Sequence, residues 1–196
     1  MAEPALDLVD ATERTSALLH PMRLRILDAP REPGSATSVP RQLGTTRQKV
    51  NYHLRELEKA GFLEEVEQHR SGNCLERIVR ATATHYLINP EVLGRLAADP
   101  DRVEDRFSST YLIALASQAI RDIAAAQQAT AGSKKRVATL SLQADVRFAS
   151  AAARASFATE LANAVARLVA KYHDAKADGG RTFRLIVGAY PARKKR

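Results

Sequence analysis

The chain has 196 residues, with 30 lysine and arginine residues against 22 acidic ones and a formal net charge of +8. That length allows one large or two small domains with hydrophobic cores, and the basic balance suits a polyanionic partner. A single cysteine, Cys74, excludes an internal disulfide framework. The sequence begins with an acidic stretch unlike a signal peptide and has no run of about 18 apolar residues to span a membrane, so we expect a cytoplasmic protein.

The first elements predicted are helical. Residues 5–19 carry apolar side chains at loosely helical spacing, and Pro21 opens a second helix that ends before Pro30. His20, directly before this proline, is expected to pack or cap rather than to bind a ligand. Arg23 and Arg25 could touch phosphates, but solvated arginines are the simpler interpretation.

Residues 38–61 predict a short helix, a turn and a longer helix. Ser38 is a candidate N-cap with Pro40 in the first turn, and Gly44 allows a tight reversal. Thr46 can cap the second helix, which is expected to end at Gly61. Its apolar residues recur at intervals of four, three and three, and form one narrow stripe: Val50, Leu54, Leu57 and Ala60.

The other face of this second helix is polar and basic. It carries Arg47, Gln48, Asn51, Tyr52 and Arg55. Arginine can pair bidentately with guanine, and asparagine or glutamine with adenine, so this face could read a major groove. A solvated helix face would look partly similar. The residues that follow this helix favour the DNA interpretation. They form two strand-like runs around a turn at residues 70–73, and together with the two helices they predict a winged helix.

The predicted wing is acidic along its strands and basic at its tip. Glu64, Glu65, Glu67 and Glu76 lie on the strands. They would repel DNA, so only the tip is expected to approach it, with Arg70 on a phosphate or in a narrow minor groove. Arg77 and Arg80 are expected to balance the glutamates. Residues 84–88 predict a last strand before Asn89-Pro90.

Three segments, ALLHPMRLRIL at 17–27, QLGTTRQKVNYHLRELEKAGFLE at 42–64 and RIVRATATHYLI at 77–88, carry a family resemblance. With them, residues 17–88 resemble the winged helix–turn–helix regulators of the ArsR type. The resemblance implies sequence-specific DNA binding by a dimer, usually as a transcriptional repressor.

The second half of the chain is predicted to be helical up to about residue 130 and to combine strands with a helix after that. A short helix is expected over 90–98 and a long one over about 101–130, which we interpret as the dimer interface, with an intramolecular bundle as the alternative. The expected interface residues are Phe107, Tyr111, Leu115, Ile120 and Ile123. After a linker at 131–136, residues 137–148 predict a strand, Ser150 caps a helix to about Tyr172, and 182–190 predict a second strand. This unit either packs on the long helix or joins its strands to those of a second subunit.

Metal, cofactor and catalytic sites are not predicted. Metal-sensing ArsR-type proteins use cysteine pairs near the reading helices or histidine and carboxylate pairs on the dimer helix, and this chain departs from both patterns. The five histidines are scattered without ligand spacing: His20, His53, His69, His85 and His173. His69 and Cys74 flank the wing turn, but two ligands on an exposed hairpin are weak evidence. No nucleophile or phosphate-binding motif indicates an enzyme.

We therefore expect a mainly α protein with a small β component. It would comprise a winged helix–turn–helix domain at 1–89, a helical dimerisation segment at 90–130, a C-terminal β-α-β unit at 131–191 and a basic tail at 192–196. Base contacts are expected from Arg47, Gln48, Asn51 and Tyr52, and phosphate contacts from Thr46, Lys49, Arg55 and Arg70. The predicted protein is a homodimeric regulator of double-stranded DNA, with an unidentified small-molecule or protein effector possible. The alternative is a ligand-sensing or protein-interaction module whose winged helix does not read DNA.

Overall fold

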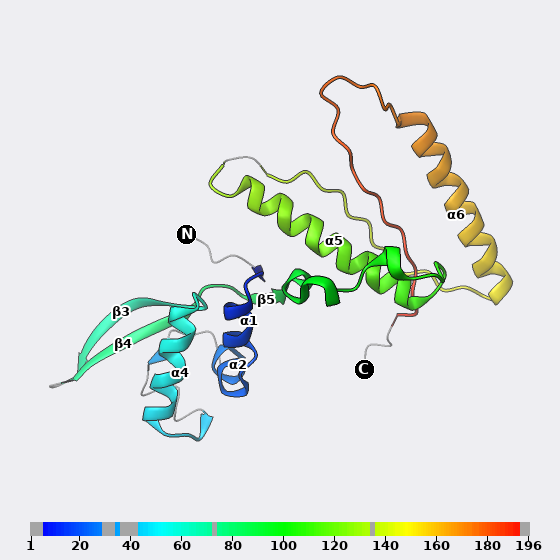
Figure 1. Ribbon diagram of the computed structural model, residues 1–196. Helices are drawn as coiled ribbons and strands as arrows, with labels where there is room; N and C mark the ends of the chain where they lie inside the picture. The colour runs from blue at the N-terminus through cyan, green and yellow to red at the C-terminus, as the bar shows by residue number, and fades with distance from the viewer. Residues whose placement is uncertain (1–5, 29–33, 36–42, 72–73, 134–135, 193–196) are drawn as a thin grey trace. The chain divides into compact units, whose positions relative to one another are not determined.

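The computed structural model describes residues 6–28, 34–35, 43–71, 74–133 and 136–192 (Figure 1). The chain divides into two compact units, residues 1–137 and 138–196. The predicted cap and first turn at Ser38 and Pro40 lie outside the described residues. So does the predicted wing tip at Gly72-Asn73.

The first unit contains all the β-strands among the described residues. Its elements are, in chain order, β1 Leu6–Val9, α1 Thr12–Leu18, α2 Pro21–Asp28, β2 Gly34–Ser35, α4 Arg47–Lys59, β3 Leu63–Ser71, β4 Cys74–Ala81, β5 His85–Ile88, the 3-10 helices η1 Pro90–Leu96 and η2 Pro100–Arg102, and α5 Ser109–Thr130. A three-stranded antiparallel sheet has the order β2-β4-β3, and a separate parallel pair joins β1 to β5.

The wing is the long hairpin of β3 and β4. Its register runs from Leu63 opposite Ala81 to Ser71 opposite Cys74, with an irregularity between Glu65 and Glu67. Such a bulge adds local twist to the pair of strands. The hairpin directly follows α4, as the sequence predicts, and projects beyond the helices (Figure 1).

One hydrophobic core holds α1, α2, α4 and the base of the wing together. Its fully buried members come from α4, from the β3 entrance and from β1: Val50, Leu57, Phe62 and Val9. Phe62 contacts the Tyr86 ring edge-to-face, with 5.3 Å between ring centroids. The β1 and β5 strands thus contribute Val9, Tyr86 and Ile88 to this core.

The N-terminal prediction was partly wrong. Residues 6–9 form a strand, and the helix begins only at Thr12. Leu6 to Val9 pair in parallel with His85 to Ile88, and Asn89 N–H donates to the Val9 carbonyl at 2.9 Å. The apolar spacing of so short a segment fits either element, and its partner strand lies far along the chain.

The long helix is shorter than predicted. It starts at Ser109 rather than near residue 101, because side chains before it satisfy backbone groups in non-helical turns. The Asp105 carboxylate accepts from Phe107 N–H at 2.9 Å, and the Ser108 hydroxyl accepts from Tyr111 N–H at 3.0 Å as the N-cap. The short helix expected over 90–98 is the 3-10 helix η1, interrupted at Gly94, whose φ is +51°.

The second unit contains one long helix, α6 Ala151–Tyr172, capped by Ser150 as predicted. The Ser150 hydroxyl accepts from Ala153 N–H at 3.1 Å. The β-α-β prediction fails for the strands: residues 137–148 and 182–190 form no β-ladder among the described residues. A strand exists only where a second strand satisfies its backbone, and these two segments do not pair with each other.

Candidate nucleic-acid interface

The second helix of the predicted motif, α4, is anchored through a narrow apolar stripe. Val50, Leu54 and Leu57 are buried, as the sequence predicts, and Ala60 is half-buried. The Thr46 hydroxyl caps the helix by accepting from Lys49 N–H at 3.4 Å. Gly61 follows the C-cap with a φ of +75°, a conformation that favours glycine. These contacts fix one face of α4 and leave the other to solvent.

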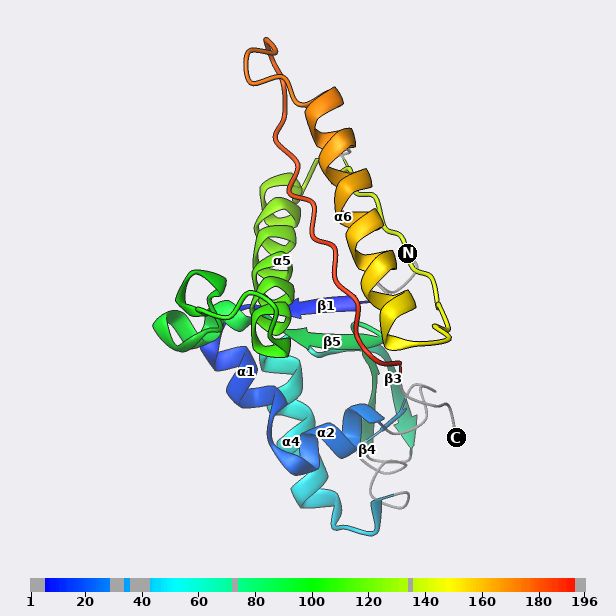
Figure 2. The ribbon, with the colours of Figure 1, turned by 90° about the vertical axis from the view of Figure 1, so that its right-hand side faces the viewer.

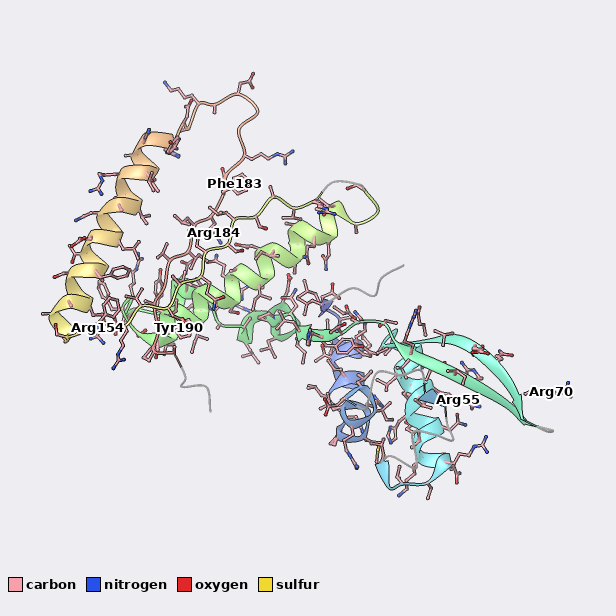
Figure 3. The ribbon with its side chains drawn as sticks, turned by 180° about the vertical axis from the view of Figure 1, so that it is seen from behind. Arg55, Arg70, Arg154, Phe183, Arg184 and Tyr190 are labelled. Carbon is pink, nitrogen blue, oxygen red and sulfur yellow. The ribbon has the colours of Figure 1, made fainter. Side chains whose placement is uncertain are left out.

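The exposed face of α4 is a row of polar side chains. Because successive residues turn by about 100°, Gln48, Tyr52 and Arg55 lie within about 50° of the direction opposite the buried stripe. All three are exposed, Tyr52 by 57%. Arg55 projects from the side of α4 that is visible in Figure 3. Among the residues predicted to contact DNA, these three lie together on the most exposed face of α4.

The other residues predicted to contact DNA lie on the flanks of that row. Asn51 is half-buried on one flank, with Arg47 on the same side at the N-terminal end of the helix. Lys49 is exposed on the opposite flank, and Thr46 is exposed at the cap. Long side chains on the flanks of a groove-inserted helix can reach base edges or, since the two phosphate chains border the groove, the backbone.

A pair of histidine rings joins α4 to the start of α2. The His53 ring lies 4.5 Å from the His20 ring and 5.1 Å from the Tyr52 ring, between centroids. His20 Nδ1 accepts from Met22 N–H at 3.2 Å, so it caps α2 as expected. Burial lowers the pKa of His53, and the nearby His20 and Arg23 lower it further, while Glu56 opposes them. Within the described part of the chain, His53 Nδ1 is buried without a hydrogen-bond partner.

The arginines of α2 are structural. Arg23 donates to the Ala17 carbonyl at 2.9 Å and forms an ion pair with Glu56 at 3.7 Å, so it joins α1, α2 and α4. Arg25 donates to the Leu43 carbonyl at 3.1 Å, at the residue before the Gly44 turn. These contacts account for both side chains without DNA.

Two acidic side chains of the wing strands, Glu64 and Glu65, are paired with arginines, as the sequence suggests. Arg80 lies 2.5 Å from the Glu64 carboxylate, and Arg77 contacts both Glu65 and Glu58, the latter at 2.5 Å. The Arg77 hydrogen bond, helped by Gln68, lowers the pKa of Glu65. The negative charge of Glu64 and Glu65, at the base of the wing, is therefore partly offset.

Arg70 lies near the end of the described hairpin and is exposed (Figure 3). Its backbone is opposite Leu75 in the β3–β4 register, one pair short of the last described pair. An arginine at this distance from the helices can reach a phosphate or a minor groove that the recognition helix does not touch.

Arg14 is a residue that sequence reasoning missed. Its guanidinium donates to the Ala60 carbonyl at 3.0 Å, to Asp7 at 2.6 Å, and lies 4.7 Å from the centre of the Phe62 ring. It thereby ties β1 and α1 to the C-cap of α4. The contact with Ala60 spans 46 positions in sequence, and no local pattern signals it.

The residues predicted for the dimer interface do not share one face of α5. Tyr111 and Leu115 lie on one side, and Ile120 lies about half a turn away because the interval from Leu115 is five residues. Ile123 is exposed by 44%, and Phe107 lies fully exposed before the helix begins. Arg121 donates to the Ala98 carbonyl at 3.0 Å, so part of α5 packs within its own chain.

No set of three histidine, cysteine, aspartate or glutamate side chains in the described residues could hold a metal ion. The side chains of His69 and Cys74 are not among those described. None of the described helices is long and apolar enough to cross a membrane.

A buried stripe that fixes a helix, an exposed polar face opposite it and a β-hairpin directly after it are consistent with a winged helix–turn–helix domain. Comparison with known families agrees with the central part: residues 18–66 match a family described as a helix-turn-helix domain. This match covers α2, α4 and the start of β3, and a helix-turn-helix domain suggests a DNA-binding regulator. The match does not show that the domain is of the ArsR type. Comparison with curated proteins found no match.

Proposed function

We propose that the protein is a sequence-specific regulator of transcription that binds double-stranded DNA as a homodimer. Residues 46–60 would lie in the major groove, and the wing near 70–73 would contact the backbone or the minor groove. The observation that carries this proposal is the exposed polar row of α4, held in place by its buried stripe. A helix anchored on one face and polar on the other is what groove reading requires.

Within that helix, the proposed roles follow position and chemistry. Gln48 and Tyr52 face outward and are proposed to meet base edges, with Arg47 and Asn51 reaching bases from one flank. Lys49, Arg55 and Thr46 are proposed to hold phosphates.

Arg70 is proposed to anchor the wing on DNA. The pairing of Arg77 and Arg80 with Glu58, Glu64 and Glu65 supports this, because it reduces the repulsion that the wing strands would otherwise exert.

The homodimer and the repressor role rest on other grounds. DNA-binding proteins of this type gain affinity by placing two DNA-binding domains on half-sites about one helical turn apart, which requires a second copy of the chain. Repression is the usual role in the ArsR-type family that residues 17–88 resemble. Interface contacts from α5, including Tyr111, Leu115 and Ile123, remain part of the proposal.

A second candidate is a ligand-sensing or protein-interaction module whose winged helix does not read DNA. The exposed apolar side chains of the second unit favour it, since they indicate a partner other than DNA. A combined version is a DNA reader regulated by a small molecule or protein.

Fluorescence anisotropy with a pool of randomised duplexes, followed by sequencing of the bound fraction, tests the proposal. We expect a two-fold-symmetric motif with half-sites about one helical turn apart and a steep dependence on salt. Arg55→Ala should weaken binding, and Arg154→Ala, which removes the same charge from exposed α6, is the matched control. Weak binding without an enriched motif would favour the second candidate.

A further inference from the structure

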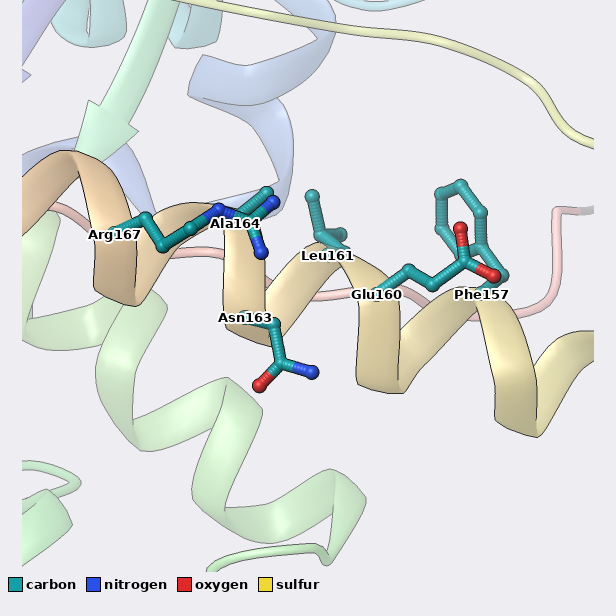
Figure 4. A pocket seen from close by; sticks show the side chains of 6 residues that line it. All are labelled: Phe157, Glu160, Leu161, Asn163, Ala164 and Arg167. Atoms are coloured by element: carbon teal, nitrogen blue, oxygen red, sulfur yellow. The ribbon is translucent and has the colours of Figure 1, made fainter.

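The helix of the second unit is amphipathic but uncovered. None of the 22 residues of α6 is buried. Its apolar stripe follows intervals of four, three and four: Phe157, Leu161, Ala164 and Leu168. A hollow of about 360 Å³ lies against this stripe, and all six residues that line it come from α6 itself (Figure 4).

The two segments beside α6 have the sequence of strands without their hydrogen bonds. In the first, residues 138–148, every even position is apolar: Ala138, Leu140, Leu142, Ala144, Val146 and Phe148. In the second, residues 182–190, the odd positions are apolar, from Phe183 to Ala189. Leu140, Leu142 and Phe183 are exposed by 81%, 89% and 66%. Period-two alternation of this length is typical of strands with one buried face.

The two segments run in the same direction. Each is antiparallel to α6, and Figure 2 shows them on either side of the helix. They form no ladder with each other. A single helix connects these two parallel segments, and they do not pair with each other. If both belong to one sheet, another strand must lie between them. The strand for that position must come from elsewhere.

We propose that a second copy of this chain supplies it, so that two second units form one interleaved four-stranded sheet. The order would be residues 138–148, the partner's 182–190, residues 182–190 and the partner's 138–148. A two-fold axis normal to the sheet relates the two central strands. Both α6 helices then cover the same face, the one that receives Leu140, Leu142, Phe183 and Leu185.

The choice of the central strand follows from its second face. Residues 182–190 carry Ile186 and Tyr190 beside Arg184 on the face away from α6, whereas 138–148 carry only polar and charged residues there, including Gln143, Asp145 and Arg147. Charged and polar side chains suit the edge of a sheet, and a more apolar strand suits its centre.

The exposed apolar side chains of the second unit are numerous. Eleven large ones are exposed: Leu140, Leu142, Val146, Phe157, Leu168, Val169, Tyr172, Phe183, Leu185, Val187 and Tyr190. A sheet completed by a second copy would give the residues of 138–148 and 182–190 that face α6 a continuous apolar layer to pack in.

A single-cysteine scan of the full chain tests the strand order. In a Cys74→Ser background, single cysteines are placed at each of positions 183–187. The cysteine nearest the two-fold axis should form a disulfide between copies, and a cysteine two residues from that position should give a lower yield of cross-linked dimer. Cysteines at Thr139 or Ser141 are the matched controls. Their copies would be separated by three strand spacings, about 14 Å, beyond the roughly 7 Å that a disulfide can bridge.

A proline variant tests the interface without cross-linking. Ile186→Pro removes a ladder N–H from the proposed central strand and should weaken the dimer at least tenfold by sedimentation equilibrium. Ala192→Pro lies beyond the apolar alternation and should change dimerisation less than twofold. Retained helical circular dichroism would show that Ile186→Pro still folds. A dimer that survives Ile186→Pro, a monomeric parent, or cross-links only from 139 or 141, would overturn the inference.

The inference shares the homodimer with the proposed function and uses a different surface. Anisotropy of the same variants on a duplex with a two-fold-symmetric site separates the two. Cysteine variants that cross-link as expected while the parent binds no DNA would refute the function alone. A parent that binds the two-fold-symmetric site while its cysteine variants fail to cross-link would refute the interleaved sheet alone.

Discussion

Arg14 offers the sharpest test of how α4 is held. Its guanidinium meets three groups that no other described side chain joins: the Asp7 carboxylate of β1, the Ala60 carbonyl at the C-cap of α4 and the Phe62 ring. Arg14→Met keeps much of the side-chain length and removes all three polar contacts. Asp7→Asn removes only the charge of one partner.

The structure sets the expected size of the effect. A hydrogen bond from a charged donor to a carbonyl contributes about 1.5–3 kcal/mol, and a cation–π contact about 0.5–1 kcal/mol. The ion pair, with side chains exposed by 27% and 21%, adds up to about 1 kcal/mol. Because these contacts share one group they do not add fully, and we expect Arg14→Met to cost about 3 kcal/mol. Asp7→Asn should cost about 1 kcal/mol.

Amide hydrogen exchange over residues 54–63 measures this loss where it occurs. Phe62 N–H donates to the Leu57 carbonyl at 2.8 Å and Ala60 N–H to Glu56 at 3.1 Å, so both amides report on the cap. At about 1.4 kcal/mol per tenfold change, Arg14→Met should exchange about 100-fold faster. Arg102→Met, which loses an exposed pair with Asp99, should leave these amides unchanged. A rise below threefold for Arg14→Met would refute the reasoning.

Four further predictions concern α4. Asn51→Ala should cost about 1–3 kcal/mol of DNA binding and relax preference at one base pair, and an unchanged motif would remove it from the base contacts. Lys49→Ala or Arg55→Ala should weaken binding to all sequences and reduce the salt slope by about one unit each, by anisotropy. Because burial lowers the pKa of His53 below 6.5, the unfolded state binds more protons, so the free energy of unfolding should fall as pH drops below about 6.5. His53→Gln should flatten that decline, and equal pH curves would contradict the assignment. Leu57→Ala, at a fully buried site, should cost about 2–5 kcal/mol in urea unfolding, and less than 1 kcal/mol would contradict its place in the core.

The sequence by itself determined the parts of the protein whose signals are local. The stripe of Val50, Leu54 and Leu57, the caps at Thr46 and Ser150, and the hairpin after Gly61 all follow from side-chain periodicity and hydrogen-bonding capacity within one element. The outward row of α4 follows from the same periodicity, because burying one face of a helix exposes the other.

Only the tertiary structure decided the features that depend on partners far along the chain. Residues 6–9 became a strand through β5, and Arg14 reached the carbonyl of Ala60, 46 positions away. The segments 138–148 and 182–190 have strand sequences and form no ladder within the described chain. Alternation shows which face a strand would bury, but a strand forms only when a second backbone satisfies its N–H and C=O groups, and the position of that backbone is a property of the assembled fold.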